Sequence, residues 1–303
     1  MARVVISLVT WNSEKDVPAC LAAMQKQTFS DLHLVIVDNA SEDETRSVLS
    51  RVTRHMSNVH LISNGVNRGY AVAHNQAIRW ATEHGAEFVL VLNPDVVLSA
   101  DALAVLVRAM EVHTKAGSVG LPLVHEDGTV DSLGLEVRWG GQCAERGGHT
   151  SYTRVSHDER VLGVSGACAL YRLSALTACA EIRDGSVDFF DETFFAYKED
   201  VDVALRLRAC GWESWITHAT TARHGRAVAD ASRGSVVFQY RGRAERSERR
   251  SYLSYRNHLF LLRKHWKSMP VPKWQIVLYE FGKALYVLLR EPQLLKAWKE
   301  FVL

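Results

Sequence analysis

The sequence has few of the features that mark disulfide-rich, zinc-binding or secreted proteins. Its 303 residues include five cysteines without paired spacing: Cys20, Cys143, Cys168, Cys179 and Cys210. That pattern argues against a disulfide framework and a zinc site, and predicts a reducing compartment. The first residues run directly into a strand-like stretch, with no hydrophobic core and cleavage site of a secretory signal, so a cytoplasmic location is expected.

The chain also lacks a long uninterrupted hydrophobic run. The C-terminal stretch Trp274–Phe301 is apolar but broken by Glu280, Lys283 and Arg290, whereas a membrane-spanning helix needs about 20 mainly apolar residues. Three tryptophans lie in or near this stretch: Trp266, Trp274 and Trp298. A helix lying in a membrane interface is one interpretation. A helix packed on the rest of the chain or on a second subunit is equally compatible.

The chain has little net charge, but its positive and negative residues are unevenly distributed along the sequence. The net charge is +2, yet the segment Arg241–Lys273 holds ten Lys and Arg against two Glu, a local balance of +8 that leaves −6 for the remainder. Such a basic block indicates a polyanionic partner, either anionic lipid, a diphosphate-linked acceptor or nucleic acid. A solvated helical face would explain any one of these residues equally well.

Four short apolar runs predict buried strands: Val4–Val9, Leu32–Val37, Val59–Ile62 and Phe88–Leu92. They are rich in β-branched residues and nearly continuous, as in strands covered on both faces. A helical pattern follows each run: Val17–Gln27, Asp43–His55, Tyr70–His84 and Asp101–His113. Gly85 suits the left-handed end of the third helix. The alternation predicts an α/β chain with a doubly wound, mostly parallel sheet.

Short polar side chains follow all four predicted strands, where parallel sheets bind ligands. They lie in the segments Thr10–Asn12, Asp38–Ser41, Asn64–Tyr70 and Asn93–Asp95. No Gly-X-Gly-X-X-Gly follows the first strand, which excludes a dinucleotide-dependent oxidoreductase. A sugar nucleotidyltransferase, which would need a glycine-rich basic loop at the same place, is excluded by the same absence.

Individual residues of this edge each have a functional and a structural explanation. Asp95, beside the stiff Pro94, could bind a divalent cation together with substrate phosphates, or cap the following helix. Asp38 could accept a hydrogen bond from the ring N–H of uracil or thymine, or form a turn with its neighbours. Gly69 permits close backbone approach to a phosphate or ribose, or belongs to an ordinary loop.

A second group of acids lies far along the chain, where Glu199 and Asp200 open a helix over Val201–Cys210. The helix dipole explains one acid at this position but hardly three, because Asp202 follows. Asp200 could remove a proton from an acceptor hydroxyl as general base, and Asp202 with Arg206 predicts an ordinary helix pair. His224 could complete a metal site with Asp95, although a lone histidine is more often structural.

Taken in order, these segments resemble the family 2 glycosyltransferases with the GT-A fold, especially the bacterial rhamnosyltransferase-like members. The matching pieces are Val5–Asn12, Val35–Ser41, Asn67–Asn75, Leu90–Val96, Gly166–Arg172 and Phe194–Gly211, continuing through His224 and to Asn257. The resemblance implies a GT-A domain over residues 1–226, with a nucleotide-sugar half (1–116) and an acceptor half (117–226). A basic, amphipathic helical region follows over residues 227–303.

The resemblance also assigns roles to residues. Contacts to the nucleotide or donor fall on Thr10, Asn12, Asp38, Asn67, Gly69, Asn75 and Asn93. Asp95 and His224 would bind Mg²⁺ or Mn²⁺, and Asp200 with Glu199 would be catalytic. The acceptor side would include Trp139, Gly166 and Ala167. Asn93 replaces the first acid of the family's Asp-X-Asp motif, which makes Asp95 the principal metal carboxylate.

The expected activity is inverting transfer of a sugar, best matched by L-rhamnose from dTDP-rhamnose. The acceptor would be a hydroxyl of a saccharide or polyprenyl-diphosphate-linked saccharide in surface polysaccharide synthesis. A UDP- or GDP-sugar donor is the alternative, and a non-catalytic nucleotide-sugar-binding module a remote one. The basic C-terminal region is then expected to meet an anionic membrane peripherally at its inner face, rather than nucleic acid, and an oligomer is compatible.

Overall fold

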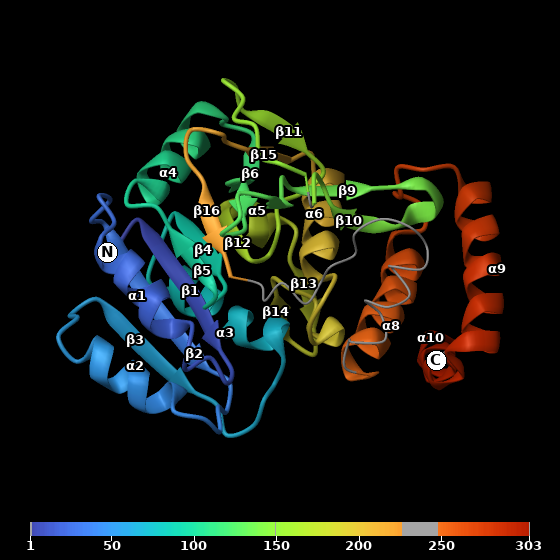
Figure 1. Cartoon of the computed structure of the whole chain (residues 1–303), viewed down its shortest axis with the longest axis horizontal. Helices are drawn as coiled ribbons and strands as arrows, with labels where there is room; N and C mark the ends of the chain where they lie inside the picture. Colours follow the sequence, from blue (N-terminus) through green and yellow to red (C-terminus); the bar gives the residue numbers. More distant parts are fainter. Residues whose placement is uncertain (1, 149, 226–247, 303) are drawn as a thin grey trace.

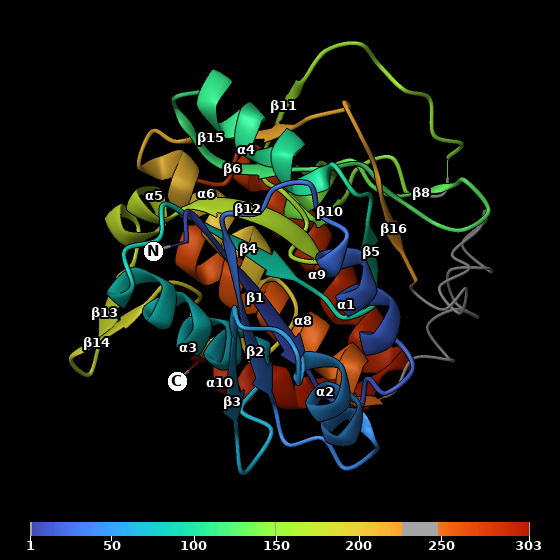
Figure 2. The same cartoon turned by 90° about the vertical axis from the view of Figure 1, so that its left-hand side faces the viewer.

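The computed structural model describes residues 2–148, 150–225 and 248–302, drawn in two orientations in Figures 1 and 2. The four predicted strands are present as β1 (Val4–Thr10), β2 (Leu32–Asp38), β3 (Val59–Ser63) and β4 (Phe88–Leu92). The helices between and after them are α1 (Val17–Gln25), α2 (Thr45–Thr53), α3 (Tyr70–Glu83) and α4 (Ala102–Val112). Gly85 has a φ of 67°, confirming the left-handed end of α3.

The second half of the chain contributes shorter elements. Its strands are β5 (Val96–Leu98), β6 (Ala116–Gly120), β7 (Leu123–Val124), β8 (Val130–Ser132), β9 (Leu135–Val137), β10 (Cys143–Glu145), β11 (Glu159–Val161), β12 (Cys168–Arg172), β13 (Glu181–Arg183), β14 (Ser186–Asp188), β15 (Glu213–Ile216) and β16 (Ala222–His224). Its helices up to residue 225 are η1 (Trp139–Gly141), α5 (Leu173–Ala178), η2 (Glu192–Phe194) and α6 (Glu199–Ala209).

The main sheet has the strand order β11-β15-β6-β12-β4-β1-β2-β3. Strands β4, β1, β2 and β3 are mutually parallel, whereas β12 runs antiparallel between β4 and β6. The fold is therefore α/β with a mainly parallel, mixed sheet, as predicted. Strand β6 lies inside the sheet, because β15 pairs with its outer side.

Alternate residues of the central strands enter two different cores, because successive side chains of a strand point to opposite faces. Ile6, Ile36 and Leu90 pack on one face with helices α1, α2 and α4. Val5 and Val89 pack on the other face with α3, α5 and α6. This explains the continuous apolar runs. The prediction that β3 is buried on both sides is wrong, since β3 is the edge strand and its Leu61 is 47% exposed.

A smaller sheet, ordered β5-β16-β7-β8, brings distant segments together. Within it His224 of β16 pairs with Val96 of β5, directly after Asp95. Strand β8, two strands from β16, carries Asp131. The short pairings in this sheet therefore assemble three ionisable residues that are far apart in sequence.

The C-terminal helices are α8 (Glu248–His265), α9 (Lys273–Arg290), η3 (Pro292–Leu295) and α10 (Lys296–Val302), and they gather at one end of the molecule in Figure 1. The single helix expected over 274–301 ends at Arg290, because Pro292 cannot continue it. Leu261 and Leu262 of α8 share a hydrophobic core with Val201 and Leu205 of α6. The predicted boundary at residue 226 lies outside the described residues.

No helix in the described part of the chain has the length and apolar character needed to cross a bilayer.

Candidate active site

A crevice of about 480 Å³ opens at the carboxyl ends of β1 and β4, and we call it the strand-end crevice. Predicted residues line it, namely Asn12, Asn67, Gly69, Asn93 and Asp95. The size is that of a typical small-molecule site. The sequence rule that ligands bind beyond the strand ends therefore located the crevice correctly.

Asp95 meets His224 at this crevice. The imidazole Nε2 lies 3.2 Å from Asp95 Oδ1, while Nδ1 lies 2.7 Å from Asp131 Oδ2. His224 is buried, and its Nε2 has an ion-pair distance but no well-directed hydrogen bond among the described residues. Sequence reasoning missed Asp131, because the three-residue strand that carries it has no recognisable pattern.

Two opposing effects act on His224. Burial alone would lower the pKa of the imidazole, but the carboxylates of Asp131 and Asp95 raise it to about 9. Asp16, at the start of α1, lines the same crevice, and burial together with the Asp95 charge raises the pKa of its carboxyl. Acidic groups thus concentrate on this side of the crevice, which favours a cation there.

The residues present fit a divalent cation only in part. A carboxylate on His224 Nδ1 fixes the imidazole so that Nε2 points toward Asp95, which is the usual support of a metal-binding histidine. No cluster of three or more His, Cys, Asp or Glu suited to a metal occurs within residues 2–148, 150–225 and 248–302. Asp95 and His224 would therefore need oxygen atoms of the ligand, as Mg²⁺ sites with one or two carboxylates normally do.

The loop after β3 is held by Asn39. Its side chain donates to Asn67 Oδ1 and to the carbonyl of Gly69, and it accepts from Arg68 N. Gly69 has a φ of 88°, and a Cβ there would lie 2.6 Å from Cδ2 of the Phe195 ring. The close approach of the Phe195 backbone and ring therefore explains why position 69 is a glycine. The sequence had suggested that the close approach was to a phosphate or ribose.

The predicted nucleoside contacts Thr10 and Asp38 are buried and bonded to one another. Asp38 accepts from Thr10, from the hydroxyl of Ser41 and from Arg46, whose Nε is 2.6 Å away. The backbone N–H of Ser41 also donates to Asp38 Oδ2 at 3.3 Å. The turn foreseen as the structural alternative for Asp38 is therefore present, and Asp38 does not line the strand-end crevice.

Asn75 is not brought to the crevice. It is fully buried in α3, where its amide bonds to the backbone of Phe190 and to Glu192. It therefore joins α3 to the segment that precedes α6. This contact fixes the approach to Asp200 rather than touching the crevice itself.

Asp200 lines a second cavity of about 380 Å³, the central cavity. Its Oδ2 accepts a hydrogen bond from Gly166 N at 3.2 Å, and Oδ1 accepts from Val201 N at 2.8 Å. Tyr70 donates its hydroxyl to the Gly166 carbonyl, and Asn93 N donates to Ala167 O. The predicted residues Asp200, Gly166, Ala167 and Asn93 thus meet at this cavity, and Tyr70 was missed.

Glu199 stands next to Asp200 but in a different state. It is buried, and Oε2 has no hydrogen-bond partner among the described residues. Burial, followed by the charge of Asp200, raises the pKa of Glu199 to about 8. Glu199 therefore favours its protonated form near neutral pH, whereas Asp200 makes two hydrogen bonds to backbone N–H groups.

The segment between the two cavities is bound to α8. Asn257 donates to the carbonyls of Phe194, Ala196 and Tyr197. Phe195, Tyr197 and Lys198 all have positive φ angles, and such non-glycine conformations cost about 1–3 kcal/mol each. Those hydrogen bonds hold the strained segment.

Two arginines of α8 reach the strand-end crevice. Arg249 lies over the ring of Phe195 and Arg250 over that of Tyr197, at 5.0 and 5.7 Å. Both belong to the basic block that the sequence singled out. Two charges of the basic block therefore lie at the strand-end crevice. The sequence pattern of α8 did not predict this placement.

Asp202 and Arg206 form the predicted pair at 2.9 Å, but it is not an ordinary exposed pair. Both residues are buried, and Asp202 also contacts Lys264 and His265 of α8. Although burial opposes it, these partners lower the pKa of Asp202 well below its usual value. The pair is part of the joint between α6 and α8.

Trp139 is not brought to the central cavity. It is 49% exposed and makes an edge contact with Tyr279 of α9, with ring centroids 6.2 Å apart. It belongs to the contact between η1 and the C-terminal helices.

Comparisons with known proteins show the family of the chain. The family model described as Glycosyl transferase family 2 matches residues 5–179, more than half of the chain. An N-acetylglucosaminyl-diphospho-decaprenol L-rhamnosyltransferase from Mycobacterium tuberculosis is 30% identical over 241 residues, which cover 72% of this chain and 75% of the relative. A PGL/p-HBAD biosynthesis glycosyltransferase from Mycobacterium bovis is 29% identical over 46% of this chain and 52% of its own length.

Solved structures share the fold. TarS from S. aureus, residues 1–349, superposes with a TM-score of 0.60 at 15% identity, covering 100% of this chain and 80% of that one. The mannosyltransferase PcManGT from Pyrobaculum calidifontis, solved with GDP-Man and Mn²⁺, has a TM-score of 0.58 at 18% identity and 99% and 73% coverage. The chain belongs to glycosyl transferase family 2 and is a nucleotide-sugar glycosyltransferase with the GT-A fold.

Proposed function

We propose that this enzyme transfers L-rhamnose from dTDP-rhamnose, with inversion, to a saccharide hydroxyl on a polyprenyl-diphosphate carrier. The observation that carries the proposal is the Asp200 carboxylate, held by Gly166 N on a cavity that shares Tyr70 and Asn93 with the strand-end crevice. A base there can accept the hydroxyl proton while the oxygen attacks the anomeric carbon on the face opposite the leaving nucleotide.

The donor is assigned to the strand-end crevice. Arg249 and Arg250 supply positive charge toward a diphosphate, while Asn67 and Asn93 offer amide contacts. Asp95 and His224 would hold Mg²⁺ or Mn²⁺, which when bound neutralises the charge of the departing nucleoside diphosphate. The choice of rhamnose and of the lipid-linked acceptor is supported by the mycobacterial relative.

A binding panel tests the donor assignment. Calorimetric titrations would compare dTDP-rhamnose with UDP- and GDP-sugars, each with and without Mn²⁺. We expect the tightest binding for dTDP-rhamnose with Mn²⁺, and NMR of the product should show the inverted anomeric configuration. Preference for a UDP- or GDP-sugar would replace the donor, retained configuration would remove the role of Asp200, and binding without transfer would leave a non-catalytic module.

We also propose that α9 rests on an anionic membrane. Seven of its apolar side chains are more than half exposed: Trp274, Val277, Leu278, Phe281, Leu285, Leu288 and Leu289. Their spacing places them on one side of the helix. Exposed cations lie close in sequence to the two ends of the helix: Lys267, Arg290, Lys296 and Lys299. An apolar stripe with cations near its ends suits the boundary between anionic headgroups and acyl chains.

Vesicle co-sedimentation tests the membrane contact. The double variant Phe281→Ser/Leu285→Ser should bind phosphatidylglycerol vesicles about tenfold more weakly than the unaltered chain. Ile182→Ser is the matched control, since Ile182 is 82% exposed and lies in β13 rather than on α9. Equal binding by the double variant, or dimerisation that buries this face in light scattering, would overturn the membrane contact.

A further inference from the structure

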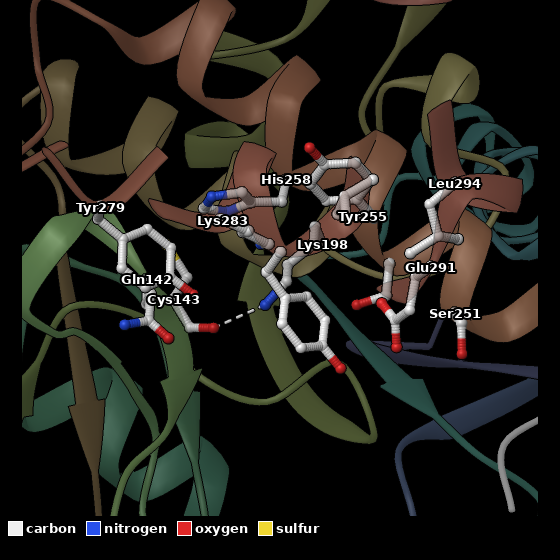
Figure 3. A pocket seen from close by; sticks show the side chains of 13 residues that line it. Gln142, Cys143, Lys198, Ser251, Tyr255, His258, Tyr279, Lys283, Glu291 and Leu294 are labelled. Carbon is white, nitrogen blue, oxygen red and sulfur yellow. Dashed lines mark hydrogen bonds between the residues drawn. The ribbon is translucent and has the colours of Figure 1, made fainter. Parts of the chain in front are cut away.

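A third cavity, which we call the helix cavity, lies between the C-terminal helices and the edge of the catalytic region (Figure 3). It encloses about 150 Å³ and is lined by residues of β10, α8, α9 and η3, together with Lys198. Its wall is closely built, because a Cβ on Gly140 would lie 2.5 Å from Cβ of Tyr279. No role assigned so far uses this cavity.

Two lysines give the helix cavity its charge. Lys198 Nζ donates to the carbonyl of Cys143 at 2.6 Å. Lys283 Nζ lies 4.9 Å from the ring centroid of Tyr255 and 5.5 Å from that of Tyr279. The acid in the lining is Glu291. Figure 3 shows Lys198 beside Gln142 and Cys143, and Glu291 toward Ser251 and Leu294.

His258 is a buried imidazole in the lining of the same cavity. Burial first, and then the charge of Lys283, lower the pKa of this histidine to about 4, although Glu280 accepts a 2.7 Å contact from it. His258 is therefore neutral at physiological pH. The cavity thus combines two ammonium groups and the carboxyl group of Glu291 with neutral hydroxyl, amide and imidazole groups and tyrosine rings.

The position of the helix cavity relates it to the reaction. It shares Cys143, Lys198 and Ser254 with the central cavity, which contains Asp200. The central cavity in turn shares Tyr70 and Asn93 with the strand-end crevice. The strand-end crevice and the helix cavity have no lining residue in common. The donor is assigned to the strand-end crevice and the base to the central cavity. The helix cavity is then available for the part of the acceptor beyond its reacting sugar.

We infer that the helix cavity binds the phosphate groups of a lipid-linked acceptor, with Lys198 and Lys283 as the cations that recognise them. This inference rests on the proposed function and adds a site to it. Ammonium groups and serine hydroxyls are suitable donors to phosphate oxygens, and tyrosine faces suit a sugar beside them. The outer, apolar side of α9 lies on the same helix that contributes Tyr279 and Lys283, so the lipid chain has an exit toward a membrane.

Calorimetry with farnesyl diphosphate tests the site, with UDP present to occupy the strand-end crevice. Lys283→Gln should weaken binding about tenfold, as expected for one charge-assisted hydrogen bond, whereas Lys283→Arg should restore most of it. Lys115→Gln, an exposed change just after α4, is the control for total charge. Inorganic pyrophosphate and farnesol, titrated separately, distinguish recognition of the phosphates from recognition of the chain.

Transfer assays separate this inference from the function on which it rests. With an N-acetylglucosaminyl-diphospho-farnesol acceptor, Lys283→Gln should raise KM about tenfold with little change in kcat, while the octyl glycoside of the same sugar should show no change. If Lys283→Gln and the unaltered enzyme have the same KM for the diphosphate-linked acceptor as well as for the octyl glycoside, and transfer is intact, the phosphate site alone is overturned. Absence of nucleotide-sugar binding would instead remove the proposed function.

Discussion

The two acidic regions of the molecule, around Asp95 and around Asp200, are built by opposite means. Asp95 lies beside a histidine whose pKa is raised to about 9 by two carboxylates. Asp200 lies beside a glutamic acid whose pKa is raised to about 8, chiefly by burial. In the first region an opposite charge compensates the acids, and in the second a neighbouring acid is kept neutral.

This difference fits a division of labour. A region of compensated charge can exchange the imidazole proton for a cation and so accept a diphosphate. A region with one half-buried acid at a cavity and a second acid whose protonated form is favoured by burial can take up a single proton without first attracting a metal. We therefore expect substitutions in the two regions to affect binding and chemistry separately, and three predictions test that separation.

The largest effect is expected for Asp200→Asn. Removing a general base typically costs 10²–10⁴ in rate, so transfer should fall by about a thousandfold while nucleoside-diphosphate affinity changes less than about twofold. Steady-state transfer assays and calorimetry measure the two quantities. Asp184→Asn, in an exposed turn where Asn also tolerates a positive φ, is the control. Normal turnover in Asp200→Asn would remove the general-base assignment.

A smaller effect is expected for Asp131→Asn, which alters the support of His224. Loss of such a partner lowers metal affinity by about 10–100-fold, so Mn²⁺-dependent nucleotide binding should weaken while metal-free binding stays the same. Glu126→Gln, an exposed acid near the same strand, is the matched control. If calorimetry shows equal affinity with and without Mn²⁺ in the unaltered enzyme, the metal role of Asp95 and His224 is wrong.

The smallest effect is a pH dependence of stability that depends on Glu199. Burial raises its pKa to about 8 in the folded chain, against 4.5 for an ordinary glutamic acid, so the native state retains a proton that the unfolded state loses. The free energy of unfolding should therefore decrease as pH rises from about 4.5 to 8, by up to a few kcal/mol. Glu199→Gln should flatten this dependence in chemical denaturation. Parallel curves for both proteins would show that Glu199 is ionised when folded.

Much of the Asp95 region could be predicted from the sequence, because β1 to β4 are continuous apolar runs whose ends carry polar residues. The helix that begins with Glu199 and Asp200 was also predictable from its acids and its following apolar positions. Asp131 and Tyr70 could not be assigned, since their roles depend on pairings between short strands and on a contact to Gly166. The placement of Arg249 and Arg250 likewise depends on how α8 packs, which periodicity does not determine.

Asn257 has a practical consequence for engineering hybrids between relatives. It fixes the backbone of residues 194–197, which lies between the strand-end crevice and the central cavity. A hybrid in which everything after residue 226 comes from a relative would therefore replace Asn257, and with it the hydrogen bonds that hold residues 194–197. It would do so together with any acceptor preference of the C-terminal helices. A junction before residue 190 would instead take residues 194–197 and the residue that holds them from the same relative.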